Sequence, residues 1–303
     1  MNNFKGRDFL SLMDYTSEDL MFYLKTAIKI KSDIDNNRSV LKDKNLAMIF
    51  QKPSLRTRMS FQVGMNQLGG HAQFISPDEI SLGKREAVKD VARVLSRYVD
   101  GIMARVFSHD DIVELAKYSD KPVVNGLSDL LHPCQGMADY LTILERFGHL
   151  DGLRLCYVGD GNNVCNTLIV GASKFGLDMA VACPKGYEPN KDIIESASKA
   201  GANIKIVNDP IKGVKGSDIV YTDTWVSMGQ EEEKIVRNEK FKKYQVNEDL
   251  TSHAKEGHIV MHCLPAHRND EITDGVMDGP NSAIFDQAEN RLHAQKAILA
   301  LNL

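Results

Sequence analysis

Four side chains able to hold an anion are crowded into residues 54–58, which read SLRTR. Ser54 and Thr57 offer hydroxyl groups, and Arg56 and Arg58 offer guanidinium groups. The apolar run before them predicts a buried strand, and the periodic apolar residues after them predict a helix. Because a helix N-terminus carries unpaired N–H groups and the positive end of the helix dipole, the position favours a phosphate-like ligand. A solvated turn capped by Ser54 is the simpler alternative, but a cap requires no arginine.

A second donor-rich helix start is HPCQ, residues 132–135. Pro133 suits the first position of a helix, and His132 and Gln135 flank it with polar groups. Alone, the motif is an ordinary helix start. Because it follows the apolar run 122–125, it is expected at the same sheet edge as the first motif, where open α/β sheets bind ligands.

The stretch GDGNN, residues 159–163, comes close to a dinucleotide-binding fingerprint. Val164 stands where that fingerprint needs its third glycine, which disfavours nicotinamide or flavin binding. The adjacent Asn162 and Asn163 instead predict a helix start that presents neutral amides. Such groups suit the carboxylate or ammonium of an amino acid.

The stretch DTWVSMG, residues 223–229, places the carboxylate of Asp223 just beyond an expected strand. Ser227 and Met228 follow in a loop that contains a glycine. A loop of this kind can bind an ammonium group and close over it. A turn with a serine cap explains the same residues equally well, so both interpretations stay open.

The stretch GHIVMHCLPAHR, residues 257–268, carries His258, His262, Cys263 and His267. A zinc site would need these side chains to converge, and adjacent residues of a strand point to opposite faces. The spacing therefore disfavours a metal site. Cys263 lies at the C-terminal end of an expected strand, where α/β sheets place active groups.

Apolar runs and helical patterns alternate from residue 45 to residue 285, which predicts βα units on mainly parallel sheets. The expected strands are 45–50, 72–75, 101–105, 121–125, 153–158, 178–182, 203–207, 218–222, 258–262 and 282–285. Since these are too many for one sheet, the predicted fold class is α/β with two doubly wound parallel-sheet domains. The expected domains are 1–148 and 149–285, with a C-terminal helix 286–303 that packs back on the first domain.

Composition places the chain among soluble globular proteins, with 303 residues of which 43% are hydrophobic and 26% charged. The net charge of −4 gives no general attraction to nucleic acid or to acidic membranes, so any anion binding must be local. Five widely spaced cysteines argue against a disulfide framework and for a reducing compartment. Because no apolar run reaches the roughly 20 residues of a membrane span and the N-terminus lacks a signal-peptide pattern, a cytoplasmic location is expected.

Taken together, the motifs resemble those of the aspartate/ornithine carbamoyltransferase family. SLRTR is similar to the family's Ser-Thr-Arg-Thr-Arg loop, HPCQ is identical to a family motif, and DTWVSMG fits the Asp-x-x-x-Ser-Met-Gly loop of the members that use ornithine. HCLP and the terminal FDQAENRLHAQKAIL complete the order. The resemblance covers essentially the whole chain, and the shared order of the motifs makes it specific.

The resemblance implies carbamoyl transfer from carbamoyl phosphate to the δ-amine of ornithine, in a cleft between the two domains, without metal or cofactor. It also implies a homotrimer or a multiple of trimers. The implied carbamoyl phosphate site consists of Ser54, Leu55, Arg56, Thr57, Ser81, Arg105, His132, Gln135, Cys263, Leu264 and Arg291. The implied ornithine site consists of Asn163, Asp223, Ser227 and Met228. The implied catalytic residues are Arg105, His132, Cys263 and Asp223.

Two positions depart from the family pattern. Leu55 replaces a threonine, which removes a hydroxyl but keeps the backbone N–H, and Ser81 stands where a longer polar side chain often reaches the site of a neighbouring subunit. The alternatives are another acceptor (N-acetylornithine, putrescine or aspartate), an α/β oxidoreductase, or a non-catalytic binding module. The sequence does not distinguish arginine synthesis from citrulline breakdown.

Overall fold

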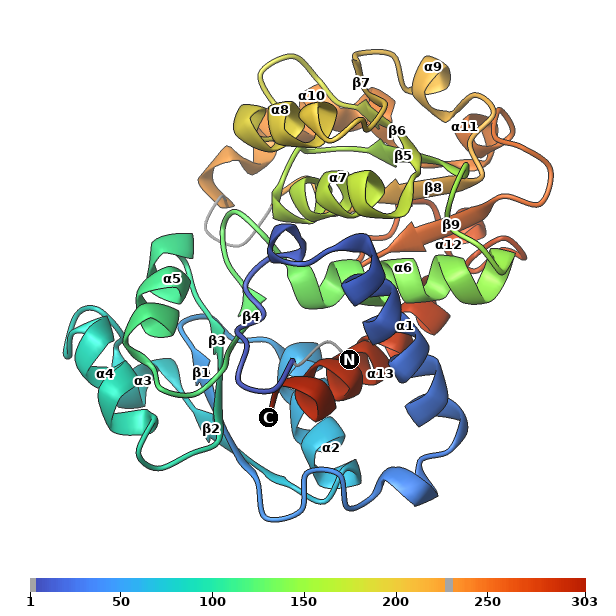
Figure 1. Cartoon of the computed structure of the whole chain (residues 1–303). Coiled ribbons are helices and arrows are strands. Elements are labelled where there is room, and N and C mark those ends of the chain that lie inside the picture. The colour runs from blue at the N-terminus through green and yellow to red at the C-terminus, as the bar shows by residue number, and fades with distance from the viewer. Residues whose placement is uncertain (1–3, 227–230) are drawn as a thin grey trace. The chain divides into compact units, whose positions relative to one another are not determined.

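The structure is a computed structural model that describes residues 4–226 and 231–303 (Figure 1). The chain forms two compact units: the first unit is Met1–Leu141 with Asn290–Leu303, and the second unit is Thr142–Glu289. Both boundaries between the units fall inside helices, namely α6 (Pro133–Phe147) and α13 (Ile284–Asn302).

The first unit contains a parallel sheet with the strand order β2-β1-β3-β4. Its strands are β1 (Asn45–Phe50), β2 (His71–Ile75), β3 (Gly101–Arg105) and β4 (Val123–Leu127). The strands β3 and β4 are buried along their whole length and read as nearly continuous apolar runs, as expected of a parallel sheet covered on both faces. The register pairs Phe50 with Arg105, so the chain leaves β1 and β3 at neighbouring points of one sheet edge.

Helices cover the sheet of the first unit. They are α1 (Ser17–Ser32), α2 (Leu55–Gln67), α3 (Pro77–Ile80), α4 (Val88–Leu95), α5 (His109–Tyr118) and the first part of α6, with short 3-10 turns η1 (Leu12–Asp14) and η2 (Asp35–Asn37). Helix α13 is tied to α1 at both Asn290 and Asn302, because Lys31 Nζ donates to Asn290 Oδ1 at 2.9 Å and the Tyr23 hydroxyl donates to Asn302 Oδ1 at 2.8 Å. Residues 290–303 thereby belong to the first unit.

The second unit contains a parallel sheet with the strand order β7-β6-β5-β8-β9. Its strands are β5 (Arg154–Val158), β6 (Asp178–Ala182), β7 (Ile204–Val207), β8 (Ile219–Thr222) and β9 (Ile259–His262). Its helices are α7 (Asn163–Phe175), α8 (Lys191–Lys199), α9 (Pro210–Val214), α10 (Lys234–Phe241), α11 (Glu248–Thr251) and α12 (Asp274–Met277), with 3-10 turns η3 (Glu231–Glu233) and η4 (Lys242–Tyr244). The apolar core on one side of this sheet includes Trp225, stacked on Phe241.

The two parallel sheets confirm the predicted fold class, and all but one of the expected strands are present. The strand expected at 282–285 is wrong, because Ile284 is the first residue of α13. Ala283 and Ile284 are buried, and a short buried apolar run is as typical of a helix start as of a strand. Only an isolated bridge between Ser282 and Val260 remains of the expected strand pairing.

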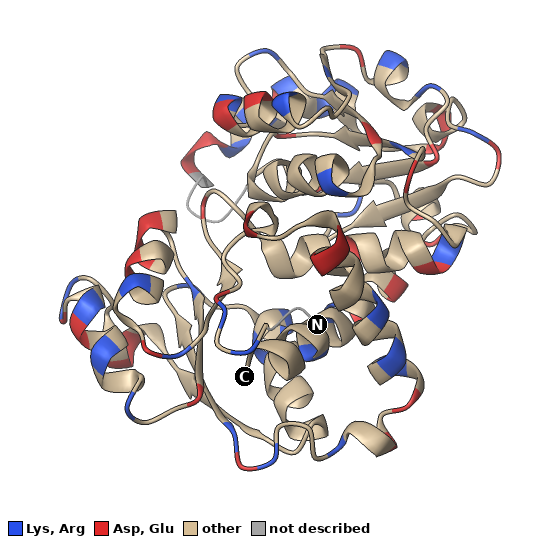
Figure 2. Ribbon diagram, viewed as in Figure 1, with Lys and Arg blue, Asp and Glu red and all other residues tan. Residues whose placement is uncertain are grey.

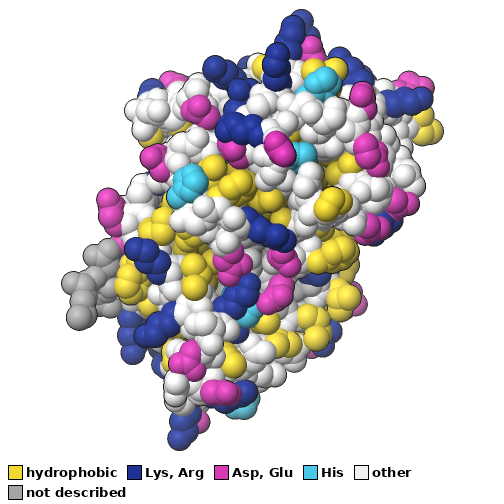
Figure 3. Space-filling model, turned by 90° about the vertical axis from the view of Figure 1, so that its right-hand side faces the viewer, with side chains coloured by type: hydrophobic (Ala, Val, Ile, Leu, Met, Phe, Trp, Pro, Cys, Tyr) yellow, Lys and Arg dark blue, Asp and Glu magenta, His cyan; other side chains and the backbone are white. Residues whose placement is uncertain are grey.

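Charges of both signs are spread over each unit rather than separated (Figure 2). The face shown in Figure 3 has basic, acidic and apolar side chains interspersed. Among the described residues, no helix combines the length and the apolar composition that a membrane span requires.

Candidate active site

The first group of predicted residues surrounds the N-terminus of α2, and we call it the anion cradle; its members are Ser54, Arg56, Thr57, Arg105, His132, Gln135 and Arg291. Ser54 has the extended backbone of a helix cap, and its Oγ accepts from Thr57 N at 3.3 Å and donates to Thr57 Oγ1 at 3.0 Å. The N–H groups of Leu55 and Arg56 belong to the open first turn, which has no intrahelical acceptor. The Leu55 side chain is 75% exposed, so only its backbone N–H is positioned to serve an anion.

Arg291 connects the cradle to distant parts of the sequence. Its Nη2 donates to Thr57 Oγ1 at 3.1 Å, and its Nη1 donates to Gln135 Oε1 at 2.9 Å. Gln135 Nε2 in turn donates to Asp139 Oδ1 at 2.8 Å. All four side chains are buried, so the network fixes a guanidinium charge beside the start of α2. The structure thus brings together helices that the sequence motifs could only place separately.

Arg105 and His132 supply the remaining buried polar groups of the cradle. Arg105 is the last residue of β3, beside Phe50 at the end of β1, and His132 directly precedes α6. Burial lowers the pKa of His132 well below its usual value, and the positive charges of Arg291, Arg105 and Lys52 lower this pKa further. The imidazole is therefore neutral at physiological pH and has one N–H to donate.

Lys52 is a cation of this region that the sequence motifs did not single out. It lies between β1 and Ser54, and its Nζ is 5.0 Å from the centroid of the Phe107 ring. Burial is the main cause that lowers the pKa of Lys52 to about 8; the charge of Arg105 lowers this pKa as well, and Asp129 opposes the shift. The available signal was its place two residues before the SLRTR motif.

Two residues near the cradle have other surroundings. The Arg58 residue is exposed, and its guanidinium lies 4.1 Å from the centroid of the Phe74 ring. This arginine of the SLRTR motif therefore makes a cation–π contact. Ser81 follows α3 with φ of 40°, in the left-handed region, and its Oγ donates to Pro77 O at 3.3 Å. The contact of Ser81 with a neighbouring subunit stays a prediction.

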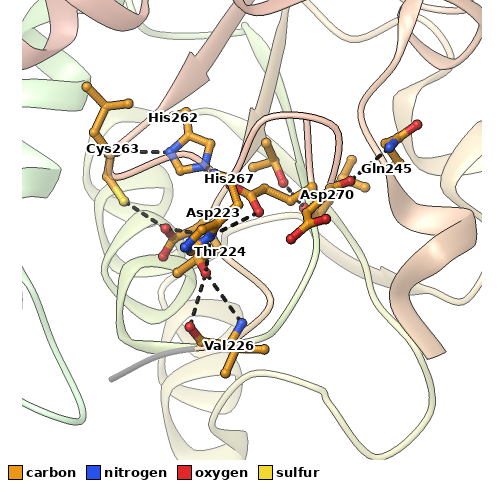
Figure 4. Close-up of polar contacts among 12 residues, drawn as sticks. Asp223, Thr224, Val226, Gln245, His262, Cys263, His267 and Asp270 are labelled. Carbon is orange, nitrogen blue, oxygen red and sulfur yellow. Dashed lines mark hydrogen bonds and ion pairs between the residues drawn. The ribbon is translucent and has the colours of Figure 1, made fainter. Parts of the chain in front are cut away.

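The second group of predicted residues lies at the carboxyl ends of β8 and β9, and we call Asp223, Cys263 and Asn162 the acidic site. The register pairs Thr222 with His262, so the next residues on the two strands, Asp223 and Cys263, come side by side. Cys263 Sγ donates to Asp223 Oδ1 at 3.0 Å, as Figure 4 shows. The structure thereby joins two residues that lie 40 positions apart in the sequence.

Asn162 completes the acidic site and was missed as a partner of Asp223. Its Oδ1 caps α7 by accepting from Val164 N at 3.0 Å and Cys165 N at 3.1 Å, while its Nδ2 donates to Asp223 Oδ2 at 2.7 Å. The predicted Asn163 is the next residue, half-buried in the first turn of α7. One asparagine therefore fixes both the helix start and the orientation of the carboxylate.

The remaining predicted ornithine-site residues, Ser227 and Met228, lie outside the described residues. Arg237 holds the segments on either side of 227–230: its Nη1 donates to Trp225 O at 3.1 Å and to Asp160 Oδ2 at 2.9 Å, and its Nε donates to Glu233 Oε2 at 2.8 Å. Burial raises the pKa of Asp160 to about 6, although Arg237 acts in the opposite direction. No motif of the sequence pointed to Arg237.

A sharp turn follows Cys263 and is held by two buried side chains. Leu264 has φ of 59°, which is unusual for a residue with a branched side chain. Its N–H donates to His262 Nδ1 at 2.9 Å, and His262 Nε2 lies 3.1 Å from Glu271 Oε1. Since Nδ1 accepts, the imidazole proton belongs on Nε2, where it donates to the carboxylate.

His262 and Cys263 converge, so the prediction that their side chains point to opposite faces is wrong. One ligand-type atom each of Asp223, His262 and Cys263 lies within 4.8 Å of the others. The reason is that β9 ends at His262, so Cys263 no longer follows the alternation of the strand. Both ring nitrogens of His262 already take part in hydrogen bonds.

Comparison with known proteins gives similarity over the whole chain. Residues 7–145 match the carbamoyl-P binding domain of aspartate/ornithine carbamoyltransferases, and residues 151–302 match the Asp/Orn binding domain. The ornithine carbamoyltransferase of Pyrococcus horikoshii is 53% identical over 99% of this chain and 96% of that protein. The protein named ornithine carbamoyltransferase, anabolic, of Pyrococcus furiosus is 53% identical over 98% of this chain and 96% of its own length.

Solved structures of similar proteins share the fold. The ornithine carbamoyltransferase from Pyrococcus furiosus has a TM-score of 0.96 and 51% identity, over 100% of this chain and 98% of that one. The ornithine transcarbamoylase of Giardia lamblia has a TM-score of 0.89 at 33% identity, over 97% of both chains.

Proposed function

Because the chain belongs to the aspartate/ornithine carbamoyltransferase family, we infer that it catalyses carbamoyl transfer from carbamoyl phosphate to the δ-amine of ornithine. The products are citrulline and phosphate, and the reaction is part of arginine metabolism. The observation that carries this conclusion is the full-length similarity, at more than half identity, to proteins named for this reaction.

The anion cradle is proposed to hold carbamoyl phosphate. The phosphate is a dianion, and the cradle offers a helix N-terminus together with guanidinium groups, which form strong charge-assisted hydrogen bonds to phosphate oxygens. The residues proposed to bind it are Ser54, Leu55, Arg56, Thr57, Arg105, His132, Gln135 and Arg291. The roles of Ser81, Cys263 and Leu264 in binding carbamoyl phosphate stay predictions.

Two charges must be stabilised on this substrate during the reaction. Negative charge grows on the leaving phosphate, and Arg56 and Arg105 are proposed to compensate it. Negative charge also grows on the carbonyl oxygen, towards which Thr57, Arg105 and the neutral His132 are proposed to donate. A neutral imidazole can donate its N–H to the carbonyl oxygen, and it avoids the cost of burying another positive charge.

The acidic site is proposed to hold ornithine. Asp223 pairs with an ammonium group, while Asn163, Ser227 and Met228 are the further proposed contacts. The δ-amine has an ordinary pKa close to that of lysine, about 10.4, and must lose its proton before it attacks. Removal from water lowers the pKa of such an amine. Asp223 and Cys263, which are hydrogen-bonded to each other, are the groups that we propose to accept or relay its proton.

We further propose a homotrimer, or a multiple of trimers, located in the cytoplasm. The family resemblance supports the assembly, and the scattered free cysteines are typical of a reducing compartment. The net charge of −4 gives no general attraction to nucleic acid or acidic lipid, and Lys and Arg positions are interspersed with Asp and Glu positions along the ribbon of Figure 2.

The proposed function is tested by incubating the purified protein with carbamoyl phosphate and one acceptor at a time. The acceptors are ornithine, N-acetylornithine, putrescine and aspartate, and both phosphate release and carbamoylated product are measured. Putrescine lacks the α-carboxylate of ornithine and N-acetylornithine lacks the α-ammonium, so each leaves a desolvated polar group unpaired, and ornithine should exceed both by at least about tenfold in specificity constant. Equal use of another acceptor would contradict the assignment of ornithine.

A further inference from the structure

The backbone around Arg105 departs from the regular sheet at the point where this residue enters the anion cradle. In the ladder between β3 and β4, Ala104 pairs with Asn125 but Arg105 pairs with Leu127, so Gly126 is skipped. An irregularity of this kind disrupts the ladder locally and changes the direction of the side chain that it carries. The place of the Arg105 guanidinium therefore depends on what holds this backbone from the side of β1.

Gln51, the first residue after β1, holds that backbone at two points. Its N–H donates to Arg105 O at 2.9 Å, and its side-chain Oε1 accepts from Phe107 N at 2.6 Å. Strands β1 and β3 are neighbours in the sheet (Figure 1), and Phe50 with Arg105 is the last pair of their ladder. The bond from the Gln51 side chain thus continues the connection between the two strands beyond the end of the ladder.

The other end of the Gln51 amide is fixed as well. Its Nε2 donates to Leu82 O at 3.3 Å and to Asp111 Oδ2 at 3.0 Å. Because Oε1 faces an N–H group while Nε2 faces a carbonyl and a carboxylate, one orientation of the amide satisfies all of these groups. Asp111 lies in the first turn of α5, so this helix holds the Gln51 side chain against Phe107.

We propose that Gln51 is a positioning residue of the anion cradle, which sets the place of Arg105 relative to the start of α2. Arg105 is proposed to serve both the leaving phosphate and the carbonyl oxygen, so its displacement weakens the stabilisation of both charges. A small misplacement of such a group costs up to about a hundredfold in rate. The inference rests on the proposed carbamoyl phosphate site.

Gln51→Met is the direct test, because methionine has a similar length and lacks both groups of the amide. We expect kcat/KM for carbamoyl phosphate to fall at least about tenfold, while the KM for ornithine stays unchanged. Calorimetry with inorganic phosphate should show weaker binding in the same variant, since Arg105 belongs to the cradle. A kcat/KM for carbamoyl phosphate equal to that of the wild type would overturn the proposal.

Gln245 provides the matched control in the second unit. It is half-buried like Gln51, and its Nε2 donates to Asn269 O and to Asp270 O, each at 2.9 Å. Gln245→Met therefore removes an amide that also binds loop backbone, but in the other unit. We expect this variant to keep the wild-type kcat/KM for carbamoyl phosphate. An equal fall in both variants would assign the effect to general loosening of the fold and contradict the proposal.

A double-variant cycle tests whether Gln51 acts through Arg105. Gln51→Met is combined with Arg105→Met, and kcat/KM for carbamoyl phosphate is measured for the single and double variants. Residues that act as a unit give losses that do not add, so Gln51→Met should have almost no further effect once the guanidinium is absent. The same fold loss with and without Arg105 would show that Gln51 acts independently, which overturns the proposal.

Two neighbouring aspartates give a test that leaves Gln51 in place. Asp110 and Asp111 both lie in the first turn of α5, and Asp111 is the one that accepts from Gln51. Asp111→Ala should raise the KM for carbamoyl phosphate several-fold, whereas Asp111→Asn keeps an oxygen acceptor and should retain the wild-type value. Asp110→Ala removes the same charge from the same helix end and should leave this KM unchanged. Equal KM values for the two alanine variants would contradict the proposal, even if Gln51→Met did not fold.

Citrulline formation by the wild type separates this inference from the proposed function. If the wild type forms no citrulline from carbamoyl phosphate and ornithine, the proposed function fails, and the phosphate titration of Gln51→Met still decides the role of Gln51. Equal phosphate affinity in Gln51→Met and the wild type would then refute that role. An active wild type whose kinetics Gln51→Met does not change refutes this inference alone.

Discussion

The anion cradle and the acidic site are built on the same local scaffold and carry opposite charge. Each lies where parallel strands end, and each includes a helix start capped by a side chain: Ser54 on α2 and Asn162 on α7. In the cradle the capped helix start meets Arg291 through Thr57. In the acidic site the cap itself donates to Asp223.

The difference shows that the position of a helix start does not determine which ligand it serves. A bare helix N-terminus favours anions, as the cradle does. In the acidic site, the Asn162 amide binds the carboxylate of Asp223, so the helix start already has an anion of the protein beside it. The site is therefore suited to a cation. The side chain at the end of the neighbouring strand, Arg105 at the end of β3 and Asp223 just after β8, thus separates the two substrates by charge.

The largest effect is expected from Arg105→Met, which removes a buried guanidinium proposed to serve both the leaving phosphate and the carbonyl oxygen. Loss of a preorganised charge of this kind costs about a thousandfold in kcat/KM. Steady-state kinetics measures the change, and circular dichroism checks that the fold persists. Arg97→Met is the control, because Arg97 is exposed and should leave the kinetics unchanged. Activity of Arg105→Met within tenfold of wild type would remove Arg105 from the catalytic residues.

A smaller effect is expected from Asp223→Asn in the acidic site. The neutral amide cannot form an ion pair with an ammonium, so the specificity constant for ornithine should fall about tenfold to a hundredfold. The penalty against N-acetylornithine should largely disappear, because the carboxylate left unpaired by that acceptor is gone. Kinetics with both acceptors measures the ratio. An unchanged preference for ornithine would separate Asp223 from acceptor choice.

Two asparagine caps test whether Asn162 acts on Asp223 as well as on its helix. Asn162 and Asn190 each cap a helix by accepting two backbone N–H groups, on α7 and α8, but only Asn162 donates to Asp223. Asn162→Ala and Asn190→Ala should each lower the free energy of unfolding by about 1 kcal/mol. Only Asn162→Ala should raise the KM for ornithine, by several-fold. An equal KM for ornithine in the two variants would mean that Asn162 acts only as a helix cap.

The smallest effect is an expected absence of titration at His132. Burial and the nearby cations lower its pKa, so the imidazole is uncharged at neutral pH and stays so on mild acidification. NMR of histidine-labelled protein, with the resonance assigned through His132→Gln, should show no titration of His132 near 6.5, about where ordinary imidazoles titrate. A midpoint close to that value would mean that His132 is solvated and that the cradle lacks the burial described here.

The local elements were predictable because their signals are local. The cap at Ser54, the helix starts at Pro133 and Asn163, and most strands follow from short patterns of residue type. The run 282–285 was assigned wrongly because a short apolar run does not distinguish a strand from a helix start.

The contacts between strands and helices could not be read from such patterns. The pairing of Asp223 with Cys263 depends on the register of β8 with β9, and the bonds of Arg291 depend on the return of α13 to the first unit. Lys52 was missed because its pKa is lowered by burial and by the charge of Arg105, and its sequence neighbours reveal neither. Family resemblance supplied candidate residues, and the structure added Lys52 and the hydrogen bond from Asn162 to Asp223.

Calorimetric titration with inorganic phosphate tests whether the cradle and the acidic site separate the two substrates by charge. Phosphate is to be titrated into wild type, Arg56→Ala and Asp223→Asn under identical conditions. We predict that Arg56→Ala weakens phosphate binding by at least about tenfold, while Asp223→Asn binds phosphate as the wild type does. Equal weakening in both variants, or weakening in Asp223→Asn alone, would contradict the assignment of the anion to the cradle.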